Sequence, residues 1–376
     1  MEFVIPRQEF LKILGHMQSI VDRKTAFPIL SNVKIEATDK LTMTAATIDF
    51  ELIESCKADI VQSGSITVNA TLLHDIVKKM PDDSEITLKL VKEHIKISAS
   101  NCKSEFNLPT LSVESFPTMT GAKLDFNFSI PTEELIVMIN KTKFAMDFQD
   151  IHYDLNGIYL HVVKENGQHL LRAVATDSMC LALKQQEVSS VNESMPGVII
   201  PRKVVMELVK LLEGTKEKDI KIEVSDVKIR LTIGEAIMTS KLIDGTFPNY
   251  QTIIPKNNDK ELIVDKLAIS QAVDRVSVIT MDKIRTVLMK ISTDKIIVSA
   301  SDRGVTQGTE EVKAKFSSEE TLEVSFNVRQ LMDILSEISG EDVKFSLLGS
   351  LNAVLVQEIE DNSSLYITMP VRRADI

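Results

Sequence analysis

The sequence predicts an α+β protein of three similar domains, each with two helices and mostly antiparallel strands. The first observation is a strand-to-helix unit that occurs three times, at residues 3–10, 128–135 and 262–269. A second unit of the same kind follows in each third, at 68–77, 200–209 and 326–335. The third observation is the length of 376 residues, which is long for one domain and typical of two or three. A threefold repeat of about 125 residues explains all three observations.

Each third opens with an apolar strand that runs into a helix. The helix starts at Pro6, Pro131 or Asp265, and the first inward-facing helical residue comes four places later. Pro and Asp suit a helix start because the first N–H groups of a helix have no partner within it. The separation is 125 residues from Pro6 to Pro131 and 134 from Pro131 to Asp265, which agrees with a repeat.

The second unit of each third predicts another helix. It begins after Asn69, Pro201 or Asn327, and its apolar residues recur at i, i+1, i+4 and i+5, which places them on one helical face. An acidic residue stands at the same place in all three copies: Asp75, Glu207 and Asp333.

Strands with alternating apolar residues follow each second helix, at 86–97, 220–231 and 343–356. Alternation with a period of two is typical of antiparallel hairpins with one buried face. A hydroxyl residue close to an aspartate marks a strand end in each third: Thr47 with Asp49, Thr176 with Asp177, and Ser301 with Asp302. These markers predict domains at 1–125, 126–254 and 255–376.

The composition excludes several classes of protein. Apolar residues make up 44% and charged residues 26%, which is typical of a globular chain and excludes disorder. The three cysteines lie far apart without a CxxC pair, so they indicate a reducing compartment and neither a disulfide framework nor a zinc site. The apolar runs are far shorter than the ~20 residues that span a bilayer, and the start of the sequence has no signal-peptide pattern. We therefore expect a soluble, cytoplasmic protein.

The net charge of −11 favours nucleic-acid binding only if positive charge gathers on one surface. The predicted helices, at 6–22, 70–80, 131–147, 201–213, 265–283 and 327–338, hold 13 Lys+Arg and 13 Asp+Glu. The whole chain has 43 Lys+Arg and 54 Asp+Glu, which leaves 30 basic and 41 acidic residues outside these helices. The whole excess of acidic residues therefore lies outside the helices. Helix faces that simply mix charges explain the same count, and both interpretations stay open.

No motif for catalysis, nucleotide binding or metal binding occurs: GxxxxGK[ST], GxGxxG, HExxH and GxSxG are all absent. We therefore expect no catalytic residue, no cofactor and no metal. A repeat protein without site chemistry is typical of a scaffold or a binding ring.

The sequence also resembles a known family, the bacterial β sliding clamps, which are the processivity subunits of the replicative DNA polymerase. The stretches that carry the resemblance lie at 27–32, 149–157, 174–177, 200–203, 240–250 and 369–372. The resemblance implies a head-to-tail homodimer, a ring of six domains with helices lining the hole and sheets outside. Such a ring encircles double-stranded DNA without sequence preference and tethers the replicative polymerase, while a separate clamp loader opens it.

The resemblance implies DNA contacts at Lys24, Gln149 and Tyr153. Charge and position add four more candidates on helices or loops: Arg202, Lys203, Lys283 and Arg285. Thr71 and Asp154 stand where relatives often have a basic and an aromatic residue, so we expect weaker phosphate contact there. Alternatively, Gln149 and Tyr153 belong to a purely structural loop.

The resemblance also implies a pocket for partner peptides. Its residues are Leu155, Thr176, Met179, Leu181, Pro248, Ile253, Met369, Pro370, Val371 and Arg372. Ser178-Met179-Cys180 replaces a common Gly-His-Arg, and Thr252 replaces a common Arg, so we expect a softer and less basic pocket. We expect the C-terminal residues 373–376 near its rim. The alternative is that these residues are only core at a domain boundary.

At the ring joint, the resemblance implies that Phe106 of one subunit meets Val278 and Ile279 of the other, closing the sheet across edge strands. Two other functions stay open. One is a hydrolase or transferase with an unrecognised site, which paired carboxylates in a cleft would favour. The other is a scaffold that binds proteins only, which retention on circular DNA would exclude.

Overall fold

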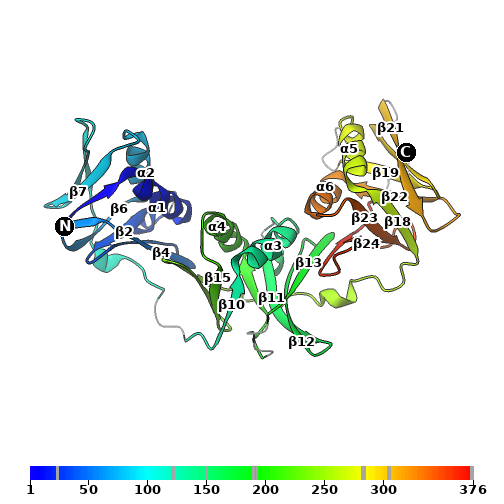
Figure 1. Ribbon diagram of the computed structural model, residues 1–376, viewed down its shortest axis with the longest axis horizontal. Coiled ribbons are helices and arrows are strands. Elements are labelled where there is room, and N and C mark those ends of the chain that lie inside the picture. Colours follow the sequence, from blue (N-terminus) through cyan, green and yellow to red (C-terminus); the bar gives the residue numbers. More distant parts are fainter. Residues whose placement is uncertain are drawn as a thin grey trace. The chain divides into compact units, whose positions relative to one another are not determined.

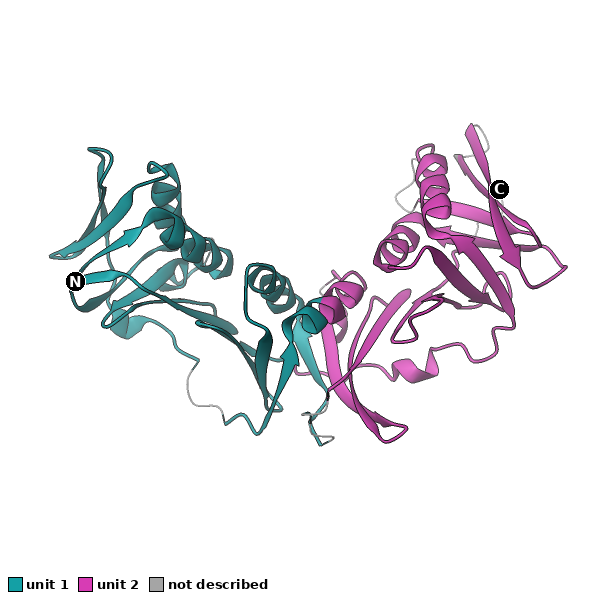
Figure 2. Cartoon of the chain, viewed as in Figure 1, with its two compact units in different colours: residues 1–136, 190–243 teal, residues 137–189, 244–376 magenta. Residues whose placement is uncertain are grey.

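A computed structural model describes residues 1–376 apart from 23–24, 120–122, 150, 189–190, 192–193, 281–284, 303–305 and 373–376. The chain forms two compact units (Figure 2). Unit 1 comprises residues 1–136 and 190–243, and unit 2 comprises residues 137–189 and 244–376. The middle third of the sequence therefore contributes to both units.

Unit 1 contains two antiparallel sheets (Figure 1). The smaller has the order β5-β1-β7-β8-β9, and the larger has the order β10-β15-β16-β17-β4-β3-β2-β6. Their strands are β1 (Glu2–Pro6), β2 (Asn32–Ala37), β3 (Leu41–Ala46), β4 (Phe50–Cys56), β5 (Asp59–Gln62), β6 (Gly64–Asn69), β7 (Glu85–Val91), β8 (His94–Ala99), β9 (Glu105–Pro109), β10 (Phe126–Pro131), β15 (Asp219–Val224), β16 (Lys228–Ile233) and β17 (Ala236–Lys241). A further strand, β14 (Val198–Pro201), leads into α4 (Arg202–Glu213).

Unit 2 contains strands in the order β11-β12-β13-β25-β24-β23-β18-β21-β20-β19-β22. Their bounds are β11 (Gly157–Glu165), β12 (Gln168–Thr176), β13 (Cys180–Glu187), β18 (Lys260–Asp265), β19 (Thr286–Ile291), β20 (Lys295–Asp302), β21 (Thr306–Phe316), β22 (Leu322–Asn327), β23 (Asp342–Leu347), β24 (Val354–Glu358) and β25 (Ser364–Thr368). The pairing of β13 with β25 joins strands far apart in the sequence into one ladder.

Within the described residues, each third of the sequence has two α-helices, as predicted. They are α1 (Arg7–Ile20), α2 (Ala70–Lys79), α3 (Thr132–Lys143), α4, α5 (Lys266–Ser277) and α6 (Val328–Glu337). Asn69, Asp265 and Asn327 cap α2, α5 and α6, because each side-chain oxygen accepts a bond from a backbone N–H of the first turn. The α+β class and its antiparallel hairpins are confirmed, whereas the boundaries at 125/126 and 254/255 stay predictions.

Packing against the sheets buries the apolar faces of these helices. Phe10 of α1 is fully buried and meets Phe3 of β1 edge to face, with ring centroids 6.1 Å apart. Leu331 and Ile334 of α6 are equally buried. None of the described helices is long and apolar enough to cross a membrane.

Candidate functional site

The turn between β12 and β13, in unit 2, is held by its own side chains. The Thr176 hydroxyl donates to the Cys180 carbonyl at 2.7 Å and accepts from the Ser178 amide at 3.2 Å. Asp177 Oδ1 accepts from the amides of Met179 and Cys180 at 2.9 and 2.6 Å. This network turns the Met179 side chain outward, where 47% of it is exposed, and buries Cys180.

Two of the three hydroxyl residues that marked strand ends, Thr176 and Thr47, therefore have a structural role. Thr47 caps the turn before β4 in the same manner, because its backbone amide donates to the Phe50 carbonyl and its hydroxyl accepts from the Asp49 amide. Ser178 differs from its neighbours because its φ is +75°. A side chain in this left-handed region costs about 1 kcal/mol, which glycine avoids.

The C-terminal segment lies beside this turn. Cys180 and Leu181 of β13 pair with Thr368 and Ile367 of β25. Beyond β25, the Met369 amide donates to the Met179 carbonyl at 2.9 Å, and the Val371 amide donates to the Ser325 carbonyl of β22 at 2.8 Å. Residues 369–372 are therefore held between the β12–β13 turn and the edge strand β22.

Two more segments reach the same end of the β11–β13 hairpins. Leu155 is buried in the 3₁₀ turn η3 (Tyr153–Leu155), which comes just before β11. The start of β11 pairs with the end of β12, so Leu155 lies near the β12–β13 turn. The Tyr153 hydroxyl donates to the Asp244 carbonyl at 3.2 Å, which ties η3 to the segment that carries Pro248 and Ile253. Ile253 is 41% exposed and Pro248 is half-buried.

The structure thus gathers the predicted pocket residues at one end of these strands. Met179 and Ile253 are exposed, and so is Arg372; Pro248, Met369 and Val371 are half-buried; Leu155, Thr176, Leu181 and Pro370 are buried. The buried members support the surface from below, and the others offer apolar contact area. A cavity of about 430 Å³ lies next to Ile253 and is also lined by Leu348. Ile253 is the one predicted pocket residue in the lining of this cavity.

The predicted DNA contacts are spread over both units. Gln149 and Tyr153 are exposed in unit 2, on the loop after α3, and so is Arg285 before β19. Arg202 and Lys203 begin α4 in unit 1, where the Lys203 ammonium donates to the Ile20 carbonyl at 3.2 Å. Lys24 and Lys283 lie outside the described residues.

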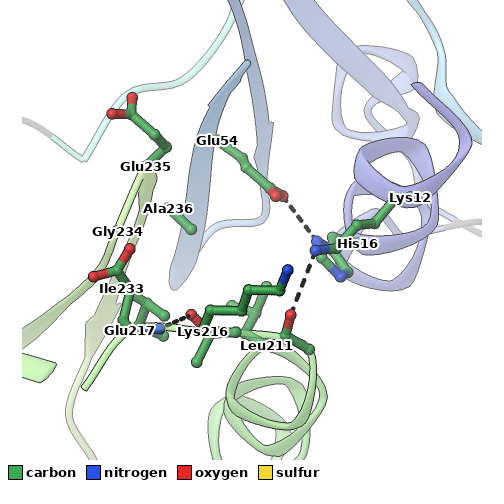
Figure 3. A pocket seen from close by; sticks show the side chains of 12 residues that line it. Lys12, His16, Glu54, Leu211, Lys216, Glu217, Ile233, Gly234, Glu235 and Ala236 are labelled. Atoms are coloured by element: carbon green, nitrogen blue, oxygen red, sulfur yellow. Dashed lines mark hydrogen bonds and ion pairs between the residues drawn. The ribbon is translucent and has the colours of Figure 1, made fainter. Parts of the chain in front are cut away.

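A cavity in unit 1 is lined by residues of α1, β4, α4 and the segments that follow α4 (Figure 3). Lys12 donates to the carbonyl of Gly214, just after α4, at 3.4 Å, and His16 Nδ1 lies 2.8 Å from Glu54 Oε2. These groups line the cavity, which has a volume of about 210 Å³, together with Lys216, Glu217 and Glu235, so its lining contains both cations and carboxylates. Nowhere in the described ranges do three or more His, Cys, Asp or Glu residues gather to hold a metal ion.

Two of the three predicted ring-joint residues, Phe106 and Val278, are exposed. Phe106 is exposed on β9, the edge strand of the smaller sheet of unit 1. Val278 directly follows α5 in unit 2 and is 74% exposed. Ile279 is half-buried, and a Cβ placed on Gly308 would come within 3.4 Å of its Cδ1 atom.

Sequence reasoning missed several residues that support these sites. Asp177 caps the β12–β13 turn, and its Oδ2 also accepts from the side-chain Nε2 of Gln330 in α6 at 3.1 Å. The recurring hydroxyl–aspartate marker could have indicated Asp177. Arg172 and His161, which contact Tyr250, carried no local signal, because only the fold brings them to it.

Comparisons with known proteins cover the whole chain. Models of the DNA polymerase III beta subunit match in three parts: the N-terminal domain at residues 1–120, the central domain at 129–249 and the C-terminal domain at 251–372. The beta sliding clamp of Caulobacter vibrioides is 37% identical over 373 residues, which is 99% of this chain and 100% of the relative. That of Pseudomonas aeruginosa is 34% identical over 374 residues, with coverage of 99% and 100%.

Solved structures agree with the sequence matches. A sliding clamp from Bartonella birtlesii bound to griselimycin superposes with a TM-score of 0.95 at 38% identity, covering 99% of this chain and 100% of that one. A clamp from Caulobacter crescentus, with polyethylene glycol bound to a putative beta-motif tethering region, also has a TM-score of 0.95. It is 37% identical and covers 99% of both chains.

Proposed function

Because the chain belongs to the DNA polymerase III beta subunit family of β sliding clamps, we propose that it acts through three surfaces: a DNA-facing set, a ring joint and a partner-peptide pocket. The protein is a DNA sliding clamp of three clamp domains. It is a non-catalytic processivity factor that forms a dimer, encircles DNA and binds the polymerase.

The partner-peptide pocket is the best supported of the three surfaces. The observation that carries it is the bond from the Met369 amide to the Met179 carbonyl, because it brings the C-terminal segment to the β12–β13 turn. Exposed Met179 and Ile253 offer apolar area, adaptable at Met179, that suits the Leu and Phe anchors of a short peptide. Pro248 and the segment 369–372 complete the proposed contact surface. The buried residues Leu155, Thr176 and Leu181 pack underneath it and support it.

The DNA-facing set consists of Lys24, Gln149, Tyr153, Arg202, Lys203, Lys283 and Arg285. Such contacts to phosphates are weak and independent of sequence, so they break and reform as the ring moves. The exposure of Gln149, Tyr153, Lys203 and Arg285 supports this role. Encirclement prevents loss of the clamp while it slides.

The ring joint would form where Phe106 on the edge strand β9 meets Val278 and Ile279 of the second subunit. An open strand edge with exposed apolar side chains suits pairing with another chain. The high exposure of Val278 supports this assignment, since a large apolar side chain in water is stabilised by burial. We place the protein in the cytoplasm, in line with its role in replication.

The experiment that tests encirclement compares circular and linear duplex DNA. A loader places the clamp on nicked circles, and gel filtration then measures how much clamp stays with the DNA. We expect retention on circles and loss after a restriction enzyme linearises them. Equal retention on both forms would contradict a topological link.

A further inference from the structure

Four aromatic rings form a row beneath the proposed pocket. Phe247 stacks on Tyr159 with centroids 4.8 Å apart, and Tyr159 stacks on His161 at 4.7 Å. Tyr250 meets the edge of His161 at 5.7 Å. Tyr159 and His161 lie two positions apart on β11 and therefore on the same face of the sheet. Phe247 and Tyr250 lie on either side of Pro248 in the sequence, and each packs on a ring of β11. The segment that carries Pro248 is therefore held against this strand at both ends.

The hydroxyl of Tyr250 has two buried partners. Tyr250 is only 3% exposed; its oxygen lies 3.0 Å from His161 Nε2 and accepts from Arg172 Nη1 at 3.4 Å. A guanidinium can only donate, so the phenol hydrogen is free to point at His161. Burial and the charge of Arg172 lower the pKa of His161 to about 4, so its ring is neutral at pH 7 and can accept that hydrogen.

Arg172 is itself held in place. It lies opposite His161 in the β11–β12 register and is buried. Its Nε donates to Gln185 Oε1 at 2.9 Å, and its Nη2 donates to Glu165 Oε1 at 2.5 Å. The planar guanidinium thus has one fixed orientation, which also fixes the position of the Tyr250 oxygen.

The backbone of Tyr250 connects this network to the pocket wall. Its amide donates to the Pro248 carbonyl at 2.7 Å, and its carbonyl accepts from the Ile253 amide at 3.0 Å. A shift of the Tyr250 ring would therefore move the residues on both sides. Pro248 and Ile253 are the partially exposed ones, which a partner can reach.

We infer that Tyr250 is a positioning residue of the partner-peptide pocket, which Arg172 and His161 hold so that Pro248 and Ile253 form one fixed apolar wall. This inference rests on the proposed pocket. The three side chains are buried, so a peptide on the surface would contact Pro248 and Ile253 and not these groups. They act by pre-organising the wall, which reduces the ordering cost of binding.

The test is a titration of a fluorescent peptide with Leu and Phe anchors against the intact dimer. Tyr250→Phe keeps the ring and removes only the hydroxyl. We expect its affinity to fall about fivefold, mainly through faster dissociation, because the hydroxyl loses its hydrogen bonds to His161 and Arg172. Tyr366→Phe is the matched control: it removes the hydroxyl of another buried tyrosine, on β25 and outside this row, and its affinity should equal that of the wild type.

A double-mutant cycle separates positioning from a general loss of stability. Arg172→Lys keeps the charge and loses the bond to Tyr250 but leaves the bond between His161 and Tyr250, so the double variant with Tyr250→Phe should lose less affinity than the two single losses added together. Additive losses would overturn the inference. Unchanged affinity in Tyr250→Phe, with normal wild-type binding, would overturn it and leave the pocket intact. A wild type that does not bind the peptide would overturn both.

Discussion

The backbone amide of Met369 donates a hydrogen bond to the carbonyl of Met179 at 2.9 Å. The two residues are 190 positions apart in the sequence. This bond continues the β13–β25 ladder by one residue and places the C-terminal segment beside the exposed Met179 side chain. A sequence change at either residue would therefore alter the same proposed contact surface.

Deletion of residues 369–376 should abolish peptide binding and leave a dimer that encircles DNA. The deletion removes proposed anchor contacts worth roughly 1–3 kcal/mol each, about tenfold to a hundredfold in affinity per contact. Titration of a fluorescent peptide measures the loss, and retention on circular DNA verifies the ring. Deletion of 373–376 alone is the matched control, which reports on the tail separately. Equal affinity of the longer deletion and the wild type would withdraw the segment 369–372 from the pocket.

Ser178→Gly should raise the free energy of unfolding by about 1 kcal/mol, because Ser178 has a φ of +75° and glycine adopts this conformation without steric cost. Thermal unfolding followed by circular dichroism measures the change. Asn166→Gly is the control: Asn166 has a φ of +51°, but asparagine tolerates this region, so we expect a smaller gain. A lower melting temperature for Ser178→Gly would contradict the strain at this turn.

The double variant Val278→Ala with Ile279→Ala should dissociate the dimer, because it removes apolar area from the proposed joint. Light scattering over a range of protein concentrations measures the subunit mass. Leu267→Ala provides the control, since Leu267 is also an exposed apolar residue, at the start of α5, outside the proposed joint. A double variant that stays fully dimeric at nanomolar concentration would exclude these residues from the joint.

Neutralising Lys24, Arg202 and Lys203 to Gln should weaken clamp–DNA contact without affecting dimerisation. Each lost phosphate contact should reduce the slope of log K against log salt by about 0.9. Binding of the clamp to duplex DNA at several salt concentrations measures the slope. Lys40, Lys89 and Lys96 lie on strands or turns of the sheets in unit 1 and provide a charge-matched triple control. An unaltered slope would place the three residues away from DNA.

Acid should destabilise the protein through His161. Its pKa is lowered to about 4 in the folded state, first by burial and then by the charge of Arg172, against 6.5 for an unperturbed histidine. Between these values the unfolded chain binds more protons, so this group's contribution is complete above pH 6.5 and is lost as the pH falls toward 4. From pH 7 to pH 5 the loss is about 2 kcal/mol.

His161→Gln keeps a hydrogen-bond acceptor for Tyr250 but does not titrate. Urea unfolding at pH 7 and pH 5 should therefore show a smaller acid-induced loss in this variant than in the wild type. The same pH dependence in both proteins would mean that His161 is not the group responsible.

Much of the fold was predictable because its signals are local. Asp265 and Asn327 cap helices at the predicted positions, since a cap needs only a side-chain oxygen and the N–H groups of the next turn. The alternation of apolar residues at 86–97 identified the β7–β8 hairpin for the same reason. The division into compact units was not predictable, because it depends on which strands of the middle third pair with which neighbours.

The sequence by itself determined the threefold repeat, the helix starts, the alternating strands and, through resemblance, the family. Only the tertiary structure decided that Tyr250 meets Arg172 and His161, and that Met179 meets Met369. The reason is physical: helix caps and strand alternation depend on residues a few positions apart, whereas these contacts form only after separate strands have paired. The sequence does not distinguish a buried arginine such as Arg172 from an exposed one. The register of β11, β12 and β13 determines which residues Arg172 contacts.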